Sequence, residues 1–342
     1  MSGALLESLP DEIVASIEVR DAWRKRMAES STGLEFLVSD VLRWPPGSTV
    51  RVAFLDGNDA LHADIVTATK QISNASNLTL DFGVDAAGRH RRWTEADTEY
   101  QAEIRVSFDL GGYWSLVGTD STDATIGAPM HLAGGRPNQR SLNLGGFKTN
   151  RPPDWEGTVR HEFLHALGFQ HEHQNMRGPC EAEFRWEDDE GYVPTQNANG
   201  VFVTDSGGRR PGIYTYLAGE PNNWPKWKVD HNLRTEESPG TVASEFDPAS
   251  VMLYRFESFF YKSDPSPCSP TPEGIELSEG DIRGLGLLYP ETTEGLSSIS
   301  SRAEAALAEL DGGGLEGTEA PASPYEARAV ELASAMVAQL ES

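Results

Sequence analysis

Three histidines and one glutamate at fixed spacing are the residues of this chain whose chemistry is easiest to infer. The run from His161 to His171 has the pattern H-E-x-x-H-x-x-G-x-x-H, in which Glu162 follows the first histidine. Histidines four residues apart lie one turn apart on one face of a helix, so the imidazoles of His161 and His165 can reach a single metal ion. The pattern predicts zinc bound by three histidines beside a carboxylate.

The glycine in this pattern is expected to end the helix. Gly168 tolerates the left-handed conformation with which many helices close, and the chain can then bring His171 back as the third ligand. Three neutral nitrogen ligands leave one coordination position open, which is typical of catalytic zinc. Glu162 can take a proton from a water that zinc activates, so the predicted chemistry is metal-assisted hydrolysis.

The helix that positions these residues has its own signals. It is expected to begin near Trp155, directly after the turn signal Pro152-Pro153-Asp154. Apolar residues at helical spacing face away from the histidines, which predicts that this side packs on a core. The stripe consists of Val159, Phe163, Ala166 and Leu167.

The rest of the chain predicts a mixture of helices and strands. Helices are expected over 9–28 and 59–75, strands over 50–55, 78–82 and 103–108, and an apolar stretch lies at 126–132. After the zinc motif, stretches rich in glycine and proline with little periodicity predict a loop-rich part. Ser278 and Asp281 have capping-box spacing, which predicts the start of a late helix that ends before Pro290.

A second segment allows a comparison with a known family. Gly168-Phe169-Gln170-His171-Glu172-His173 and the downstream run Ser250-Val251-Met252-Leu253-Tyr254 resemble the zinc motif and methionine turn of metzincin endopeptidases, in particular the astacin-like branch. The segment 221–232 looks more like bacterial and fungal members of that branch than animal ones. The resemblance extends over about residues 43–290.

The resemblance implies roles for individual residues. Met252 would form a hydrophobic floor under the zinc without binding it, and Tyr254 would stabilise the oxyanion during turnover. Gly168 and Glu172 would give structural support, since astacins use the equivalent glutamate to receive a freed N-terminus. The implied activity is a zinc-dependent endopeptidase acting on proteins or peptides, with Glu162 and Tyr254 as its catalytic residues.

The implied fold is the α+β fold of a metzincin-type zincin. Its upper subdomain has a mixed twisted sheet and two long helices, and its loop-rich lower subdomain holds the methionine turn and a closing helix. Residues 1–42 would be a helical extension and possible prosegment, in which Asp40 is the nearest carboxylate candidate for the zinc. Residues 291–342 form an acidic tail with ten acidic and two basic residues.

The tail is expected to contain two helices, near 300–310 and 324–341. Its second part has an apolar stripe that predicts packing on the body of the protein, with an oligomerisation or export element as the alternative. The stripe consists of Tyr325, Ala329, Leu332, Met336 and Leu340.

Composition restricts the partners and the compartment. The 342-residue chain has a net charge of −25, which argues against nucleic acids and anionic membranes as partners. No run approaches the length of a membrane-spanning helix, and the N-terminus lacks the pattern of an ordinary signal peptide. A cytoplasmic location and a non-standard export route therefore both stay open. Cys180 and Cys268 can form a disulfide or remain reduced, because oxidation state follows the compartment.

Two other functions remain compatible with the sequence. One is an inactive metzincin-like protein that only binds peptides, and the other is a zinc amidohydrolase that is not a protease. Glu162 favours an enzyme, since a protein that only binds has no need of a base. His173 and His231 are expected to be hydrogen-bonded surface histidines rather than ligands, and Trp224 and Trp227 to serve packing.

Overall fold

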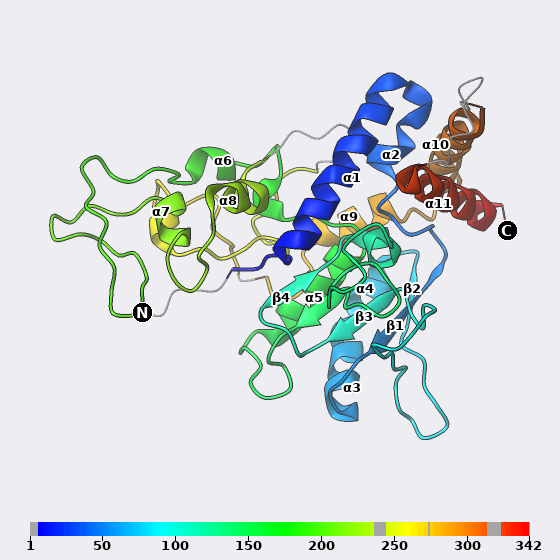
Figure 1. Ribbon diagram of the computed structural model, residues 1–342, viewed down its shortest axis with the longest axis horizontal. Coiled ribbons are helices and arrows are strands. Elements are labelled where there is room, and N and C mark those ends of the chain that lie inside the picture. The colour runs from blue at the N-terminus through cyan, green and yellow to red at the C-terminus, as the bar shows by residue number, and fades with distance from the viewer. Residues whose placement is uncertain (1–5, 236–243, 273, 313–322, 342) are drawn as a thin grey trace. The chain divides into compact units, whose positions relative to one another are not determined.

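The computed structural model describes residues 6–235, 244–272, 274–312 and 323–341 (Figure 1). These residues form two compact units. The smaller unit contains residues 6–8, 170–235, 244–272 and 274, and the larger unit contains residues 9–169, 275–312 and 323–341. Within the described residues, no helix combines the length and apolar character needed to span a membrane.

The larger unit is built on a mixed sheet of five strands. In chain order these are β1 (Thr49–Phe54), β2 (Thr79–Asp81), β3 (Ile104–Ser107), β4 (Tyr113–Ser115) and β5 (Leu142–Leu144). Their order in space is β2-β1-β3-β5-β4, with β4 antiparallel to β5 and the other pairs parallel. Every residue of β3 and β5 is buried, as expected for inner parallel strands covered on both faces.

Three of these strands, β1 to β3, confirm sequence predictions, whereas β4 and β5 were not predicted. Each of the two missed strands has only three residues, too few for an alternating pattern. The apolar stretch at 126–132 is not a regular element. There Ile126 is buried, while Met130 and Leu132 are exposed.

The predicted helix over 59–75 is two helices, α3 (Asp59–Ala68) and α4 (Lys70–Ala75). The break falls at Thr69, whose hydroxyl donates to the carbonyl of Val66. Such a local bond competes with the helical hydrogen-bond ladder. The predicted late helix is α9 (Glu279–Leu288), and it begins with the predicted capping box.

Helix α1 (Asp11–Ser30) confirms the predicted N-terminal helix and is tied to the larger unit by buried charges. The guanidinium of Arg20, 1% exposed, donates to both carboxylate oxygens of Asp120, one of them at 3.0 Å, and lies 3.3 Å from Asp123. Burial and the neighbouring Arg20 lower the pKa of Arg24 to about 10. Breaking such a buried network leaves charges without compensation, so α1 is an integral part of this unit.

The acidic tail also packs on the larger unit. Its helices are α10 (Thr293–Gly312) and α11 (Pro324–Leu340), which lie against each other and close to α2 (Phe36–Ser39) (Figure 1). Ala329, Ala333 and Met336 of α11 are buried, which confirms the predicted packing of the tail on the protein body. The shared core cluster consists of Leu34, Phe36, Leu37, Val41, Ile299, Ala303, Ala306, Leu310, Ala329, Ala333 and Met336.

The smaller unit is loop-rich, as the sequence predicts. Its short elements are η3 (Glu172–Gln174), α6 (Cys180–Glu183), α7 (Ile213–Leu217), α8 (Lys226–Leu233) and η4 (Ser258–Phe260). Aromatic side chains dominate its core, including Phe184, Phe256 and Phe260. Trp224 is part of this core, which confirms its packing role, whereas Trp227 is 44% exposed.

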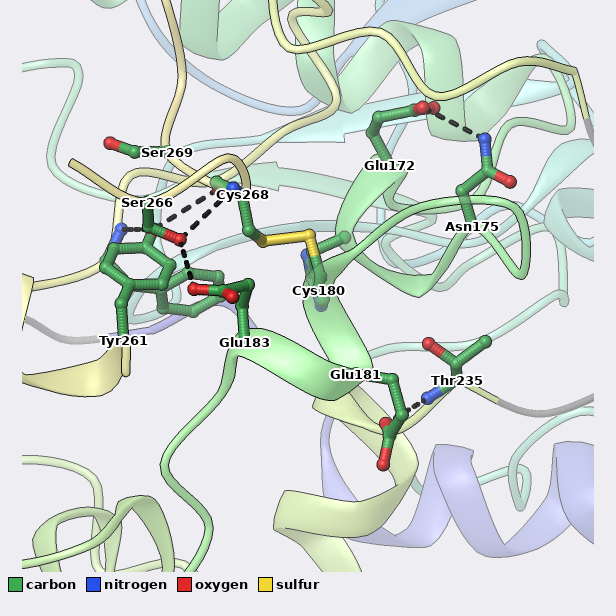
Figure 2. Close-up of a disulfide and its surroundings, with 12 residues drawn as sticks. Glu172, Asn175, Cys180, Glu181, Glu183, Thr235, Tyr261, Ser266, Cys268 and Ser269 are labelled. Atoms are coloured by element: carbon green, nitrogen blue, oxygen red, sulfur yellow. Dashed lines mark hydrogen bonds between the residues drawn. A yellow bond between two sulfur atoms is a disulfide. The ribbon is translucent and has the colours of Figure 1, made fainter. Parts of the chain in front are cut away.

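One disulfide links two distant parts of the smaller unit. Cys180 at the start of α6 is bonded to Cys268, and their Cα atoms are 5.1 Å apart (Figure 2). This decides between the two states that the sequence leaves open. Closing a loop between residues 88 positions apart stabilises a fold by restricting the unfolded chain, by about 2–4 kcal/mol.

Candidate functional site

Helix α5 (Trp155–Ala166) of the larger unit carries two of the predicted zinc ligands. The ring centroids of His161 and His165 are 4.8 Å apart, with the planes inclined by 80°, and both side chains are buried. The helix ends as predicted, since Gly168 has a φ of +96°. The predicted apolar stripe is fully buried and consists of Val159, Phe163, Ala166 and Leu167.

A hydrogen bond fixes the protonation of one of these imidazoles. His165 Nδ1 lies 2.8 Å from the carbonyl oxygen of Phe169. A carbonyl only accepts, so Nδ1 carries the proton and the lone pair of the neutral ring is on Nε2. Metal-binding histidines are commonly oriented in this way. The residues present therefore fit a divalent metal such as zinc.

The predicted base lies on the same helix. Glu162 is 1% exposed. Burial, together with the negative charges of Asp154 and Glu162, raises the pKa of Tyr113 on strand β4. The negative charge of Glu162 thus affects the pKa of a side chain on β4, which is an edge strand of the sheet.

Side chains from outside the zinc motif hold the end of α5. Trp44 Nε1 donates to the carbonyl of Ala166 at 2.9 Å, and the Tyr289 hydroxyl donates to the carbonyl of Leu167 at 2.7 Å. Burial raises the pKa of Tyr289, so its hydroxyl stays protonated. The last carbonyls of a helix have no partner within it, and these two donors satisfy them. Both residues lie within the part of the chain that resembles the family, but no sequence signal predicts a role for them.

The third predicted ligand is part of the smaller unit. The ring of His171 lies 4.9 Å from the ring of Tyr254 and 4.9 Å from the ring of His173, on which it stacks. His173 is 1% exposed, so the expectation of a surface histidine is wrong for this residue. Its Nε2 donates to the carbonyl of Asn232 at 2.9 Å, which holds the stacked pair.

The methionine turn is joined to the segment after His171. The backbone N–H of Glu172 donates to the carbonyl of Met252 at 3.0 Å, and Met252 is 1% exposed. The Glu172 carboxylate accepts from the side-chain amide of Asn175 at 3.0 Å (Figure 2) and from the backbone N–H of Asp247 at 2.8 Å. Glu172 therefore ties the segment after the zinc motif to the segment that contains the methionine turn.

One residue at the site carries no sequence signal. Glu7 accepts a hydrogen bond from the hydroxyl of Tyr254, and its Oε2 lies 3.5 Å from Nε2 of His171. Its side chain is 8% exposed. Asp40, the carboxylate expected from the sequence, instead lies in the larger unit, fully buried and paired with Arg302 at 2.6 Å.

The contacts within each unit thus gather the predicted residues into two groups. The group in the larger unit consists of His161, Glu162, His165 and Gly168. The group in the smaller unit consists of His171, Glu172, Met252 and Tyr254. Trp44, Tyr289 and Glu7, for which the sequence predicts no role, join these groups, as does His173, which was expected at the surface.

Comparisons with known proteins show which solved structures this fold resembles. No family model matches the chain, and no curated protein matches it. A solved structure of myroilysin is 26% identical, with a TM-score of 0.51, and the match covers 75% of this chain and 98% of that one. A crystal structure of myroilysin is 24% identical with a TM-score of 0.42, covering 73% of this chain and 86% of the other.

A third solved structure is high choriolytic enzyme 1, a hatching enzyme zinc-protease from Oryzias latipes. It is 17% identical with a TM-score of 0.40, over 72% of this chain and 94% of that chain. The first myroilysin structure is similar enough to indicate a shared fold. This chain is therefore similar to the astacin-like zinc metallopeptidases in two respects. Its zinc motif and methionine turn give the similarity in sequence pattern, and the myroilysin structure gives the similarity in fold.

Proposed function

We propose that this protein is a zinc-dependent endopeptidase, in which His161, His165 and His171 bind the zinc. The hydrogen bond from His165 Nδ1 to the carbonyl of Phe169 is the main support for this proposal. Because Nδ1 carries the proton, the lone pair of the neutral imidazole is on Nε2 and is available to a metal ion. The short link from His165 to His171, turning at Gly168, supports the third ligand.

The chemistry divides between the metal and the side chains. Bound zinc would supply a Lewis acid and lower the pKa of a coordinated water to about 7. Glu162 would take the proton from the attacking water and return it to the leaving amine. The Tyr254 hydroxyl would donate to the oxyanion that develops on the substrate carbonyl. Met252 would support the site as buried apolar packing.

The two alternatives differ from this proposal in what they require. A protein that only binds peptides needs neither the carboxylate of Glu162 nor the hydroxyl of Tyr254. A zinc amidohydrolase would keep both but would not cleave within polypeptides. The resemblance of the zinc motif and the methionine turn to those of astacin-like endopeptidases favours the peptidase. Proteins or peptides are therefore the proposed substrates.

The disulfide supports an oxidising location. Disulfides persist mainly in exported proteins, because cytoplasmic reductants keep thiols reduced. The Cys180–Cys268 bond therefore favours export over the cytoplasm.

We also propose that the N-terminal arm, residues 6–8, keeps the enzyme latent. The Glu7 carboxylate accepts a hydrogen bond from the hydroxyl of Tyr254 and lies 3.5 Å from Nε2 of His171. In the smaller unit, Tyr254 is the residue assigned to catalysis and His171 the one assigned to zinc binding. Asp40 is excluded from this role by its buried pairing with Arg302. Helix α1 is held by buried ion pairs, so activation would require movement of the arm alone and not removal of residues 1–42.

Glu162→Gln keeps the size of the side chain and removes its basicity. We expect peptide cleavage to fall by about 10²–10⁴-fold while zinc content stays at one ion per chain, because the base is lost and the ligands are not. Cleavage and zinc content are measured on the same preparations. Glu156→Gln, on the same helix, is the matched control. Near-normal cleavage by Glu162→Gln would disprove this mechanism.

Tyr254→Phe removes one hydroxyl and keeps the ring. A lost oxyanion donor lowers kcat by about 10²–10³-fold, and we expect KM to change little. Steady-state kinetics on a fluorogenic peptide measure both constants. Tyr192→Phe removes a hydroxyl that bonds the carbonyl of Val203 and is expected to leave kcat unchanged. An unchanged kcat in Tyr254→Phe with zinc bound would reject the assigned role.

Glu7→Gln tests latency in the full-length chain. Hydrogen bonds to charged groups contribute about 1.5–3 kcal/mol, so losing the charge should raise peptidase activity by about 10–100-fold. Glu29→Gln, an exposed change on α1, is expected to have no effect. Initial rates are compared at equal zinc content. If Glu7→Gln is no more active than the unmodified protein, the arm is not inhibitory.

A further inference from the structure

The ring of His171 is oriented by a different kind of contact from the one that orients His165. A hydrogen bond to a backbone carbonyl fixes His165, whereas the ring of His171 stacks on that of His173, with centroids 4.9 Å apart and planes inclined by 24°. The ring of His173 is 1% exposed and meets Phe256 edge-on at 5.3 Å. The proposed third ligand therefore lies against a ring that the core of the smaller unit encloses.

His173 is fixed in turn by the end of α8. Its Nε2 donates to the carbonyl of Asn232 at 2.9 Å. The side-chain amide of the next residue, Gln174, donates to the carbonyls of His231 and Arg234, at 3.0 and 3.2 Å. The last carbonyls of a helix have no partner within it and carry its partial negative charge, so they favour N–H donors. The donors of η3 and the acceptors of α8 thus satisfy each other.

The end of α8 is anchored to two other parts of the smaller unit. The guanidinium of Arg234 lies 3.8 Å from the centroid of the Trp186 ring and donates to the hydroxyl of Tyr214 at 2.9 Å. It also pairs with the carboxylate of Glu181, which accepts from the backbone N–H of Thr235 at 3.1 Å (Figure 2). Glu181 is part of α6, which begins at the disulfide, so these bonds connect α8 to a cross-linked segment.

Such an arrangement affects how tightly a histidine binds a metal ion. A mobile side chain gives up rotamer freedom when it coordinates a metal, and this loss of entropy opposes binding. A ring that is already held in one orientation loses less, so its affinity is higher. Changes to the partners that orient metal-binding histidines typically cost about 10–100-fold in metal affinity.

We propose that His173 is a positioning residue for the zinc ligand His171, and that the end of α8 gives His173 its own position. In this role His173 raises zinc affinity through the orientation of one ligand ring. Arg234 contributes at a distance, because it anchors the helix end whose carbonyls hold His173 and Gln174. The inference rests on the proposed function, since it requires His171 to bind the metal.

His173→Phe keeps a flat ring for the stack and removes the donor to Asn232. We expect zinc affinity, measured by competition with a chromogenic chelator, to fall by about 10–100-fold. The cobalt(II)-substituted protein should also change its visible absorption, which depends on ligand geometry. His131→Phe changes a half-buried histidine of the larger unit and is expected to leave both readouts unchanged. Unchanged zinc affinity in a folded His173→Phe protein would overturn the proposal.

A double-mutant cycle separates positioning from a general loss of structure. If His173 acts through His171, then His173→Phe should lower the remaining zinc affinity of a His171→Gln protein by less than about twofold. A defect in the fold would lower affinity by the same factor with and without His171, and that additive result would contradict the positioning role. Thermal unfolding of the zinc-free proteins is compared in parallel.

A distant variant tests the contribution of α8 and does not alter either stacked ring. Arg234→Met removes the guanidinium that anchors the helix end. We expect zinc affinity to fall by about 2–30-fold, as for other changes that act on a site at a distance, and the fall to disappear in the His171→Gln background. Arg210→Met removes another guanidinium of the smaller unit and is the matched control. Equal zinc affinity in Arg234→Met and Arg210→Met would reject anchoring by α8.

The outcomes separate this inference from the proposed function. If His171→Gln alone leaves zinc affinity unchanged, His171 is not a ligand, and both the proposed zinc site and the positioning role are wrong. If His171→Gln lowers zinc affinity while His173→Phe and Arg234→Met do not, the zinc site stands and the positioning role is rejected.

Discussion

The hydrogen bond from His165 Nδ1 to the carbonyl of Phe169 is the constraint on which the proposed site depends. It forms only because the chain leaves α5 at Gly168 with a φ of +96°, and a Cβ there would meet no atom closer than 3.7 Å. Conformation, not space, therefore requires glycine. Trp44 and Tyr289 fix the same turn by donating to the last carbonyls of the helix.

The smaller unit has little regular structure, so other interactions order its residues. The backbone bond from Glu172 to Met252 joins the chain after the zinc motif to the methionine turn, and the disulfide pins a second part of this unit. On this frame His171 is positioned by stacking on the buried His173. The arm uses the same surface, because Glu7 bonds to Tyr254. Catalysis and latency are thus proposed to compete for one hydroxyl.

The features that the sequence predicted are local in the chain. The stripe of α5, the glycine that ends it and the capping box at Ser278 depend on spacings of three or four residues, which a helix imposes directly. Glu7 could not be found in this way, since its contact with Tyr254 spans 247 positions and follows no period. The three-residue strands β4 and β5 are defined by pairing and not by pattern. The state of Cys180 depends on redox conditions that residues do not encode.

Binding of one zinc ion by His161, His165 and His171 is the part of the proposed function that can be tested most directly. Zinc affinity by competition with a chromogenic chelator tests it, using the single variants His165→Gln and His171→Gln with His231→Gln as control. We expect one zinc ion per chain in the unmodified protein and an equally large loss of affinity, about 10²-fold or more, in the first two variants only. Unchanged affinity in His171→Gln, with the fold intact, would contradict it.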